Sequence, residues 1–387
     1  MLRSANKKKK VIVISNFHED NSISRSNMAF NYFSDRKYDT VTLYSNFSHS
    51  QRKFRYYDNE RFISLTTIGY KSSLSFKRIL SHLMFSFQVL RYLGKSREDI
   101  IYVNLPPNIL ALFVLLKLKK KVKIILDILD LWPEAVPHNN SIIKKSMLFI
   151  VGIIPKIIRA KAIKYSDYCI TESDYFFNML DLKSKNKSTI IYIKKFQSKP
   201  LIINQVSEIF SIGYLGNIGQ IYDFDSLFKI ILGIQKKRKI ILNIIGSGPE
   251  RSWFLEKLKI HNITFKDYGI SFDENLKQKV FSKCWFGFNG YKQSTEVALS
   301  YKSVDYLSYG LPLLNSAKED TNKLVTSEKI GFNFNEDNLQ SIITKLSTIL
   351  PKDVIEMKKN AYRTFQEKFS GRSYFNEMDA VIKELSN

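Results

Sequence analysis

Short apolar runs alternate with amphipathic stretches along the whole chain. The runs predict strands over residues 10–15, 40–45, 100–104, 122–128 and 168–172 in the first half, and over 210–215, 240–245, 263–268, 285–289 and 311–315 in the second. Most are apolar at nearly every position, as is typical of parallel strands that helices cover on both faces. The alternation therefore predicts an α/β fold with parallel sheets and crossover helices.

The helical periodicity lapses near residues 190–208, where Pro200 also interrupts the chain. At 387 residues the chain is long enough for two domains of ordinary size, each with its own core. We therefore expect two doubly wound domains that face each other across a cleft, residues 1–205 and 206–369. Residues 370–387 are expected to pack back on the first domain.

The composition indicates a globular protein, with 44% hydrophobic and 25% charged residues. Cys169 and Cys284 lie in separate apolar runs, so they predict neither a disulfide framework nor a metal cluster, and they favour a reducing cytosol. The longest apolar stretches, 108–118 and 147–155, fall short of the ~20 residues that span a bilayer. The basic start of the chain precedes too short an apolar run for a signal peptide, and we expect a first strand there.

Two glycine-containing loops follow strands in the second half. GNIGQ (216–220) follows the strand at 210–215, and GSGPE (246–250) follows the strand at 240–245. Ligands of open α/β sheets bind beyond the carboxyl ends of the strands, where helix N-termini offer free N–H groups. Two such loops would suit a diphosphate, although the glycines could also serve only tight turns. The candidate ligand-binding residues are Gly216, Asn217, Gly219, Gly246, Gly248, Pro249 and Glu250.

The order of four motifs resembles glycosyltransferase family 4. The motifs are DILDLWPEA (127–135), GYLGNIGQ (213–220), IIGSGPE (244–250) and YKSVDYLSYGLPLL (301–314), and together they extend over nearly the whole chain. The DLWPE run is similar to a subgroup that builds bacterial surface polysaccharides. The resemblance implies the GT-B fold of two Rossmann-like domains and a retaining transfer from a nucleotide diphosphate sugar, with UDP-sugars favoured. It also implies that no metal or other cofactor is needed.

In this family the segment before the last Rossmann strand carries two acidic residues separated by seven others. The second usually holds the donor ribose, and Asp305 stands there in place of the usual Glu. The first position falls on Val297, which is not acidic. Glu296, one residue earlier, is the candidate for the first acidic role if the loop shifts register. Lys302 is expected to offer a cation to the donor diphosphate. The alternative is an ordinary i,i+3 surface pair between Lys302 and Asp305.

The first glycine loop departs from the family in one respect. Other members often have a basic pair just after it, whereas GNIGQIYDFD (216–225) contains no Lys or Arg. Diphosphate binding would therefore depend on backbone amides and on Lys302. The DFD run at 223–225 imitates a metal-binding motif, but it stands where a helix should begin, so we expect it to cap that helix.

The resemblance also suggests roles elsewhere. Tyr268 and Gly269, at the end of the strand at 263–268, are candidates for seating the nucleobase. Asp130 is expected to act as an acid or base, or to orient the acceptor, with capping of a strand end as the alternative. The acceptor-side candidates are His18, Arg25 and Glu134, although a lone histidine is more often structural.

The net charge is +24, and residues 1–200 carry most of it, with 35 Lys and Arg against 15 Asp and Glu. Residues 76–90 and 141–165 combine basic and apolar side chains, which suits the edge of an anionic membrane. Helices that face a core and carry solvated lysines are the alternative, and nucleic-acid binding is not expected because no known module is visible. The predicted apolar face is Phe76, Ile79, Leu80, Leu83, Phe87 and Leu90.

These expectations describe a cytoplasmic glycosyltransferase at the inner face of the plasma membrane. It would extend a glycan linked to polyprenyl diphosphate, in capsule, O-antigen or exopolysaccharide synthesis. The absent first acidic residue keeps a second hypothesis open, that of a non-catalytic carbohydrate-binding or scaffolding subunit with the same fold. An NAD-type dehydrogenase is disfavoured, because no GxGxxG follows the first strand of either domain.

Overall fold

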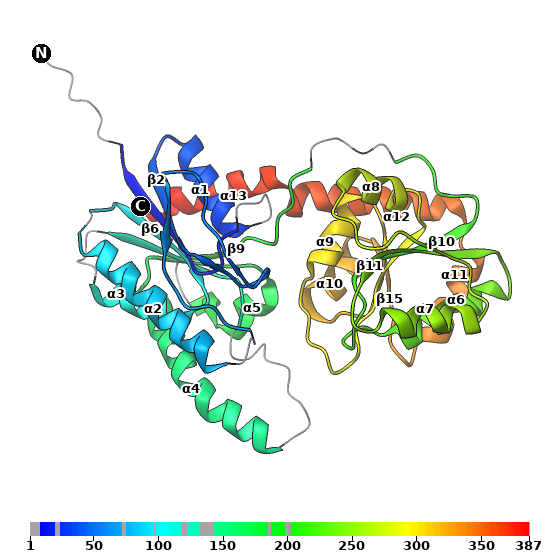
Figure 1. Cartoon of the computed structure of the whole chain (residues 1–387). Coiled ribbons are helices and arrows are strands. Elements are labelled where there is room, and N and C mark those ends of the chain that lie inside the picture. The colour runs from blue at the N-terminus through cyan, green and yellow to red at the C-terminus, as the bar shows by residue number, and fades with distance from the viewer. Residues whose placement is uncertain are drawn as a thin grey trace, which may run out of the picture. The chain divides into compact units, whose positions relative to one another are not determined.

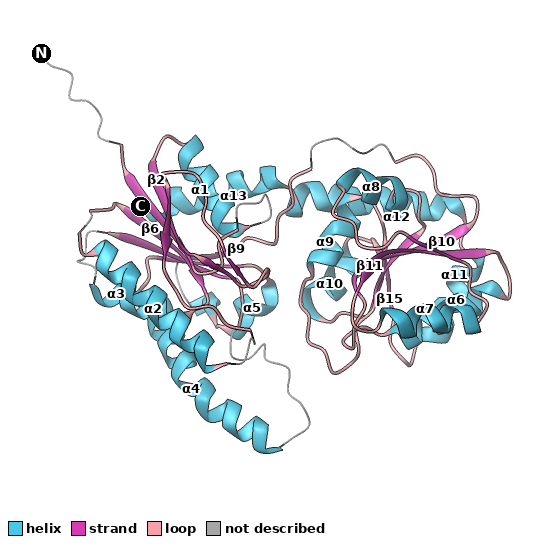
Figure 2. Cartoon of the chain, viewed as in Figure 1, coloured by secondary structure: helices cyan, strands magenta, loops and turns pink. Residues whose placement is uncertain are grey.

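The computed structural model describes residues 8–19, 24–71, 75–95, 97–117, 122–131, 142–184, 187–197, 201 and 203–386, with only the backbone described for 142–152. The chain forms two compact units (Figure 1). Unit 1 comprises Met1–Tyr192 and Tyr374–Asn387, and unit 2 comprises Ile193–Ser373. Each unit is a parallel sheet with helices on its faces (Figure 2).

The sheet of unit 1 has the order β5-β2-β1-β6-β7-β8-β9, and every neighbouring pair is parallel. Its strands are β1 (Lys10–Ser15), β2 (Asp39–Ser45), β5 (Phe62–Leu65), β6 (Ile100–Leu105), β7 (Lys123–Ile128), β8 (Tyr168–Thr171) and β9 (Ser188–Ile190). A separate antiparallel hairpin joins β3 (Phe47–Ser48) to β4 (Lys53–Phe54). The order turns at β1, whose neighbours are β2 and β6, and such a switch point is where doubly wound sheets bind ligands.

Helices cover both faces of this sheet. One core cluster joins the strands to α2 (Phe76–Leu93), α3 (Asn108–Lys117) and α4 (Ile142–Tyr165). The other joins them to α1 (Arg25–Asp35) and to α13 (Gly371–Ser386), whose Tyr374, Met378 and Val381 are buried against the sheet. The short α5 (Asp174–Met179) and a 3-10 turn (Leu182–Ser184) follow β8. The end of the chain therefore packs on the sheet formed by its beginning.

The sheet of unit 2 has the order β12-β11-β10-β13-β14-β15 and is also parallel throughout. Its strands are β10 (Phe210–Asn217), β11 (Ile240–Ser247), β12 (Phe265–Asp267), β13 (Phe286–Asn289), β14 (Leu313–Asn315) and β15 (Gly331–Asn333). The order turns at β10, which lies between β11 and β13. The switch point of this sheet is therefore next to the loop that begins with Gly216.

The core of unit 2 lies mainly between this sheet and α6 (Phe224–Gln235), α7 (Arg251–Ile260) and α11 (Leu339–Thr348). On the opposite face, glycines make room for aromatic side chains. Gly213 contacts Phe281 of α8 (Glu274–Phe281), and Gly287 contacts Tyr306 of α9 (Tyr301–Ser308). The remaining helices are α10 (Glu319–Ser327), α12 (Pro351–Thr364) and a π-helical turn (Phe365–Phe369).

Candidate functional site

The two glycine loops lie directly against each other at the carboxyl ends of β10 and β11. The strands pair to their last residues, with Gly216 opposite Gly246. A Cβ atom on Gly246 would stand 2.0 Å from the Gly216 carbonyl oxygen, and one on Gly248 would stand 2.3 Å from the Ile218 carbonyl oxygen. The Gly246 N–H also donates to the Gly269 carbonyl, at 2.8 Å. Contact between the loops is thus enough to explain why Gly246 and Gly248 are glycines.

The rest of these loops is equally close-packed. The Asn217 side chain lies between Gly219 and Gly248, because a Cβ on either glycine would meet it at 2.9 Å or less. Pro249 contacts the Gly219 position at 4.0 Å. Glu250 immediately precedes α7, and its backbone N–H donates to the Ile218 carbonyl at 3.0 Å. The candidate donor-binding residues of both loops therefore pack against one another just before α7.

Gly216 differs from the other glycines, because its surroundings include a charged side chain. Its φ of +110° lies in the region that favours glycine, and a Cβ there would meet Cε of Lys302 at 3.7 Å. Lys302 belongs to the first turn of α9, whose N-cap Ser300 accepts a hydrogen bond from the Ser303 N–H. The structure thus brings Lys302 next to the first glycine loop, which itself carries no basic residue.

Three tyrosine rings enclose the Lys302 amine. Its Nζ lies 3.7 Å from the ring centroid of Tyr222, 4.5 Å from that of Tyr214 and 5.6 Å from that of Tyr291. The side chain is only 8% exposed, and its polar contact is a long one, 3.5 Å to the Tyr214 hydroxyl. We refer to Tyr214, Tyr222 and Tyr291 as the tyrosine cage.

The electrostatics of the cage favour an anion beside Lys302. Burial lowers the pKa of Lys302 well below its usual value, and no carboxylate among the described residues offsets that effect. The faces of the tyrosine rings attract a cation and oppose the effect of burial, but only in part. A buried amine of this kind gains most from an anionic ligand that supplies the missing charge.

Asp305 lies three residues after Lys302 but does not pair with it. Its carboxylate accepts a hydrogen bond from Lys195 Nζ at 2.6 Å, and the same amine lies 2.8 Å from Glu274 and 2.9 Å from the Tyr309 hydroxyl. Burial tends to raise the pKa of Glu274, but hydrogen bonds from lysines and Tyr309 lower it to about 2. The simple surface pair between Lys302 and Asp305 is therefore wrong, since each side chain has other neighbours.

The structure also places Glu296 and the two aspartates of the DFD run. Glu296 is exposed in the segment between β13 and α9, and Val297 beside it is half-buried. Asp223 is the N-cap of α6, where its carboxylate accepts the Ser226 N–H at 3.1 Å, and Asp225 lies in the first helical turn. The capping prediction for the DFD run is confirmed. Within the described ranges, no three His, Cys, Asp or Glu side chains are grouped as metal ligands.

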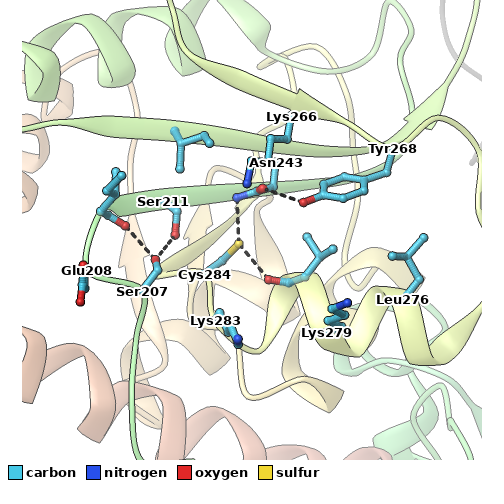
Figure 3. A pocket seen from close by; sticks show the side chains of 13 residues that line it. Ser207, Glu208, Ser211, Asn243, Lys266, Tyr268, Leu276, Lys279, Lys283 and Cys284 are labelled. Atoms are coloured by element: carbon cyan, nitrogen blue, oxygen red, sulfur yellow. Dashed lines mark hydrogen bonds between the residues drawn. The ribbon is translucent and has the colours of Figure 1, made fainter.

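Tyr268 and Gly269 follow β12 and face different surroundings. Gly269 has a φ of +66°, and its carbonyl accepts the hydrogen bond from Gly246. Tyr268 lines a cavity of about 540 Å³ on the α8 side of the sheet, and its hydroxyl points toward Asn243, at 3.4 Å (Figure 3). Burial raises the pKa of the Cys284 thiol in this cavity to about 11, so it stays protonated. Gly269, rather than the Tyr268 ring, thus adjoins the glycine loops.

A buried ion pair joins the elements of unit 1. Asp127 of β7 is fully buried and lies 3.3 Å from Arg25 Nε and 3.0 Å from Asn104 Nδ2, and the Tyr102 hydroxyl donates to it. Burial raises the pKa of Asp127, while Arg25 and its two hydrogen-bond donors oppose that change. The Arg25 guanidinium also donates to the Ile191 carbonyl. These contacts give Arg25 a structural role, and its acceptor-side role stays a prediction.

The other first-half candidates differ in accessibility. His18 is fully buried, with Nδ1 2.8 Å from Ser26 Oγ and its ring packed among Tyr44, Tyr57 and Phe62. Burial, with help from a nearby arginine, lowers the pKa of His18 to about 3, so the ring is neutral. Asp130 is half-buried just after β7, and Glu134 lies outside the described residues.

The predicted apolar face of α2 is largely exposed. Phe76 is 78% exposed and Phe87 66%, and Ile79, Leu80 and Leu83 are also exposed, whereas Leu90 is half-buried. Ile153, Ile154 and Ile157 of α4 are exposed too. The predicted face is therefore exposed for most of its length, although α2 also faces the core through Phe85, Val89 and Leu93, as the alternative expects. In the part of the chain that is described, no helix has both the length and the apolar character of a membrane span.

No protein-family model and no curated protein matches the chain, but solved structures do. One is a lipopolysaccharide outer core galactosyltransferase, WaaB, with a TM-score of 0.66 and 14% identity over 96% of this chain and 99% of that one. The Anabaena protein HepE with UDP and glucose has a TM-score of 0.61 and 10% identity, covering 97% and 99%. WaaG, a glycosyltransferase of lipopolysaccharide biosynthesis, has a TM-score of 0.62 and 11% identity, covering 96% and 98%. At these identities the likeness establishes the fold. The chain has the GT-B fold of two Rossmann-like domains.

Proposed function

We propose that the protein is a glycosyltransferase that takes a sugar from a UDP-sugar bound in unit 2. Structural neighbours support this proposal, because HepE is known in complex with UDP and glucose, and WaaB and WaaG are glycosyltransferases of lipopolysaccharide synthesis. The acceptor is a growing surface glycan linked to polyprenyl diphosphate. The reaction retains the anomeric configuration and needs no metal, as the resemblance to family 4 implies.

The observation that carries the proposal is the position of Lys302. Its buried amine has no carboxylate partner among the described residues, and the side chain lies next to Gly216, at the switch point of the sheet. A diphosphate on the glycine loops would supply the charge that the tyrosine cage lacks. The α7 N-terminus offers further N–H groups to the same anion.

Catalysis then depends on stabilising the departing UDP. The bond between the sugar and the diphosphate breaks, and negative charge grows on the leaving phosphate as it does so. A preorganised cation in a site of low dielectric stabilises that charge more than it stabilises the bound substrate. Lys302 supplies this cation, and Asp305 binds the ribose. Asp130 orients the acceptor or acts as its acid or base.

The proposal includes peripheral association with the membrane. The exposed apolar side chains of α2 and α4, together with exposed Lys156 and Lys161, support a cytoplasmic protein that lies peripherally on the inner face of the plasma membrane. Lys144 and Lys145, two further basic residues of 141–165, have no described side chains. Binding to anionic vesicles should fall as salt rises, because screening weakens attraction between exposed charges.

A panel of nucleotide sugars tests the function. One UDP-sugar is expected to raise the unfolding temperature and to be transferred to a lipid-linked acceptor in the presence of membranes. A donor at 100 times its Kd should add about 2.7 kcal/mol to the free energy of unfolding. If no nucleotide sugar stabilises the protein, the proposed donor site is wrong.

The second candidate, a non-catalytic subunit of the same fold, is favoured by Val297 at the first acidic position. Such a subunit would bind a UDP-sugar without hydrolysing or transferring it. Glu296→Gln discriminates further. A large loss of turnover at unchanged donor affinity indicates that Glu296 has taken over the acidic role, and unchanged turnover indicates that it has not.

A further inference from the structure

Lys195 lies near the start of unit 2, and its backbone is fixed on both sides. A short parallel bridge pairs it with Ser370. The Lys195 N–H donates to the Phe369 carbonyl at 2.8 Å, and the Lys195 carbonyl accepts the Gly371 N–H at 3.1 Å. The side chain extends from this bridge into the protein and is only 8% exposed. Both the root of the side chain and its amine are therefore held in place.

Three acceptors surround the Lys195 amine, which has three N–H donors. Asp305 Oδ1 lies at 2.6 Å, Glu274 Oε2 at 2.8 Å and the Tyr309 hydroxyl at 2.9 Å. The amine also lies 4.5 Å from the ring centroid of Tyr309. Since each donor has an acceptor of the protein, the amine has none left for a ligand. Lys195 can affect a ligand only through its neighbours.

The two carboxylates beside this amine differ in how many of their oxygens are used. Both oxygens of Glu274 are used, because Oε1 accepts from Lys277 at 2.5 Å, and Oε2 accepts from Lys195 and from the Tyr309 hydroxyl. Asp305 uses one oxygen, since its Oδ2 accepts no hydrogen bond from the described residues. The Asp305 side chain is also 24% exposed. Glu274 thus anchors the amine, whereas Asp305 has an open carboxylate oxygen.

Asp305 and Lys302 are neighbours on the surface of α9. Residues three apart on a helix have Cβ atoms about 5–6 Å from each other. Lys302 lies next to Gly216, where the proposed function places the donor diphosphate. The open oxygen of Asp305 therefore belongs to the same end of α9 as the proposed diphosphate site.

We propose that Lys195 is a positioning residue for the donor ribose: it fixes Oδ1 of Asp305, so that Oδ2 is oriented to accept hydrogen bonds from the ribose hydroxyls. A carboxylate that is fixed before the ligand arrives needs less ordering on binding, and this raises the affinity. The proposal rests on the UDP-sugar function and adds to it the group that orients the ribose-binding carboxylate.

Titration calorimetry on the full-length protein tests the role with UDP and with dideoxy-UDP, which lacks both ribose hydroxyls. Lys195→Met keeps a long side chain but removes the amine, so Asp305 is no longer fixed. The variant is expected to bind UDP about tenfold more weakly than the wild type, the size of one lost hydrogen bond to a charged group. Its affinity for dideoxy-UDP is expected to match that of the wild type.

A double variant shows whether Lys195 acts through Asp305. Asp305→Ala and Lys195→Met/Asp305→Ala should bind UDP with the same affinity, because the amine has no effect once the carboxylate is gone. Tyr309→Phe is the matched control within the same network. It removes one acceptor of the amine but leaves the contact between Lys195 and Asp305, so urea unfolding should show lower stability while UDP affinity stays at the wild-type value.

Four results overturn the role. They are an unchanged UDP affinity in Lys195→Met, an equal loss for UDP and dideoxy-UDP, a further loss in the double variant, and tighter UDP binding by Lys195→Met. The last would indicate that the amine withholds Asp305 from the ribose. If Lys195→Met does not fold, Lys195→Gln replaces it. The shorter glutamine has two N–H donors for three acceptors, and the same pattern is expected with a loss of about threefold.

The wild-type protein separates this proposal from the one on which it rests. A wild type that binds neither UDP nor any nucleotide sugar points to a failed donor site. A wild type that binds UDP and dideoxy-UDP equally well overturns the contact between Asp305 and the ribose, and the positioning role with it. Preference of the wild type for UDP, together with an unchanged affinity in Lys195→Met, points to a failed positioning role alone.

Discussion

Arg25 of unit 1 and Lys302 of unit 2 are both buried cations near the carboxyl ends of a parallel sheet, yet their partners differ. Arg25 lies 3.3 Å from the buried carboxylate of Asp127 and donates to the Ile191 carbonyl. Lys302 has three tyrosine rings and a long contact to one hydroxyl. The protein itself provides a counter-charge for Arg25, whereas the described residues provide none for Lys302.

The difference separates structural charges from functional ones. A buried ion pair holds elements together, and removing one member leaves the other buried without compensation. A buried cation without an acidic partner costs stability until an anion arrives. On this account Arg25 and Asp127 maintain the fold of unit 1, and Lys302 is held ready for the diphosphate of the donor.

The largest expected effect concerns the paired cation. Asp127→Leu should lower the free energy of unfolding by about 3–5 kcal/mol, because it leaves Arg25 buried and unpaired. Urea unfolding measures the change. The double variant Arg25→Met/Asp127→Leu removes both charges and should lose much less than the two single changes together. Additive losses would indicate that the two side chains do not depend on each other.

The next effect concerns the ribose. Asp305→Ala should weaken UDP-sugar binding by about 1.5–3 kcal/mol, the usual size for hydrogen bonds to a charged group. Titration calorimetry measures the affinity. Glu274→Gln is the matched control, since Glu274 shares the Lys195 amine with Asp305 and should leave the affinity unchanged. Equal losses in both variants would show that the Lys195 network matters only for structure.

A smaller effect is the dependence of stability on pH. Burial lowers the folded-state pKa of Lys302, and it lowers that of Lys358, which is also buried, to about 8 from a usual 10.5. Below the folded pKa both states carry the proton, and the full cost of burial applies. As pH rises toward 10.5 the unfolded chain holds more protons than the folded one, so the free energy of unfolding increases. Lys302→Met should flatten the part of this rise that lies between the lowered folded-state pKa of Lys302 and 10.5, and an identical profile in wild type and variant would contradict the assignment.

Most of the fold could be predicted from the chain itself. All ten predicted strands appear with slightly shifted ends, and the GT-B architecture is confirmed. The strands that sequence reasoning missed are β5, β9 and β15, which have three or four residues and half-buried positions. Such short strands lack the apolar run that marks the others, because their side chains are only partly covered. The β3–β4 hairpin, with two residues in each strand, carried no signal at all.

The candidate site was predictable only in part. Strand order along the chain was enough to pair the two glycine loops, because consecutive strands of such sheets are often neighbours. The tyrosine cage was not predictable, since Tyr214, Tyr222 and Tyr291 meet only after β10 and β13 pair. The partner of Asp305, Lys195, lies 110 residues away and gave no signal either.

The stability of Lys302→Met, with and without a UDP-sugar, tests the central claim most directly. Without ligand, the variant should be more stable than the wild type by about 1 kcal/mol or more, because an uncompensated buried amine is replaced by an apolar chain of similar length. With the donor, only the wild type should gain stability. Lys358→Met serves as the control, since the Lys358 amine donates to the Cys284 carbonyl at 2.9 Å and its loss should leave donor stabilisation intact. A destabilised Lys302→Met that still gains stability from the donor would contradict the account.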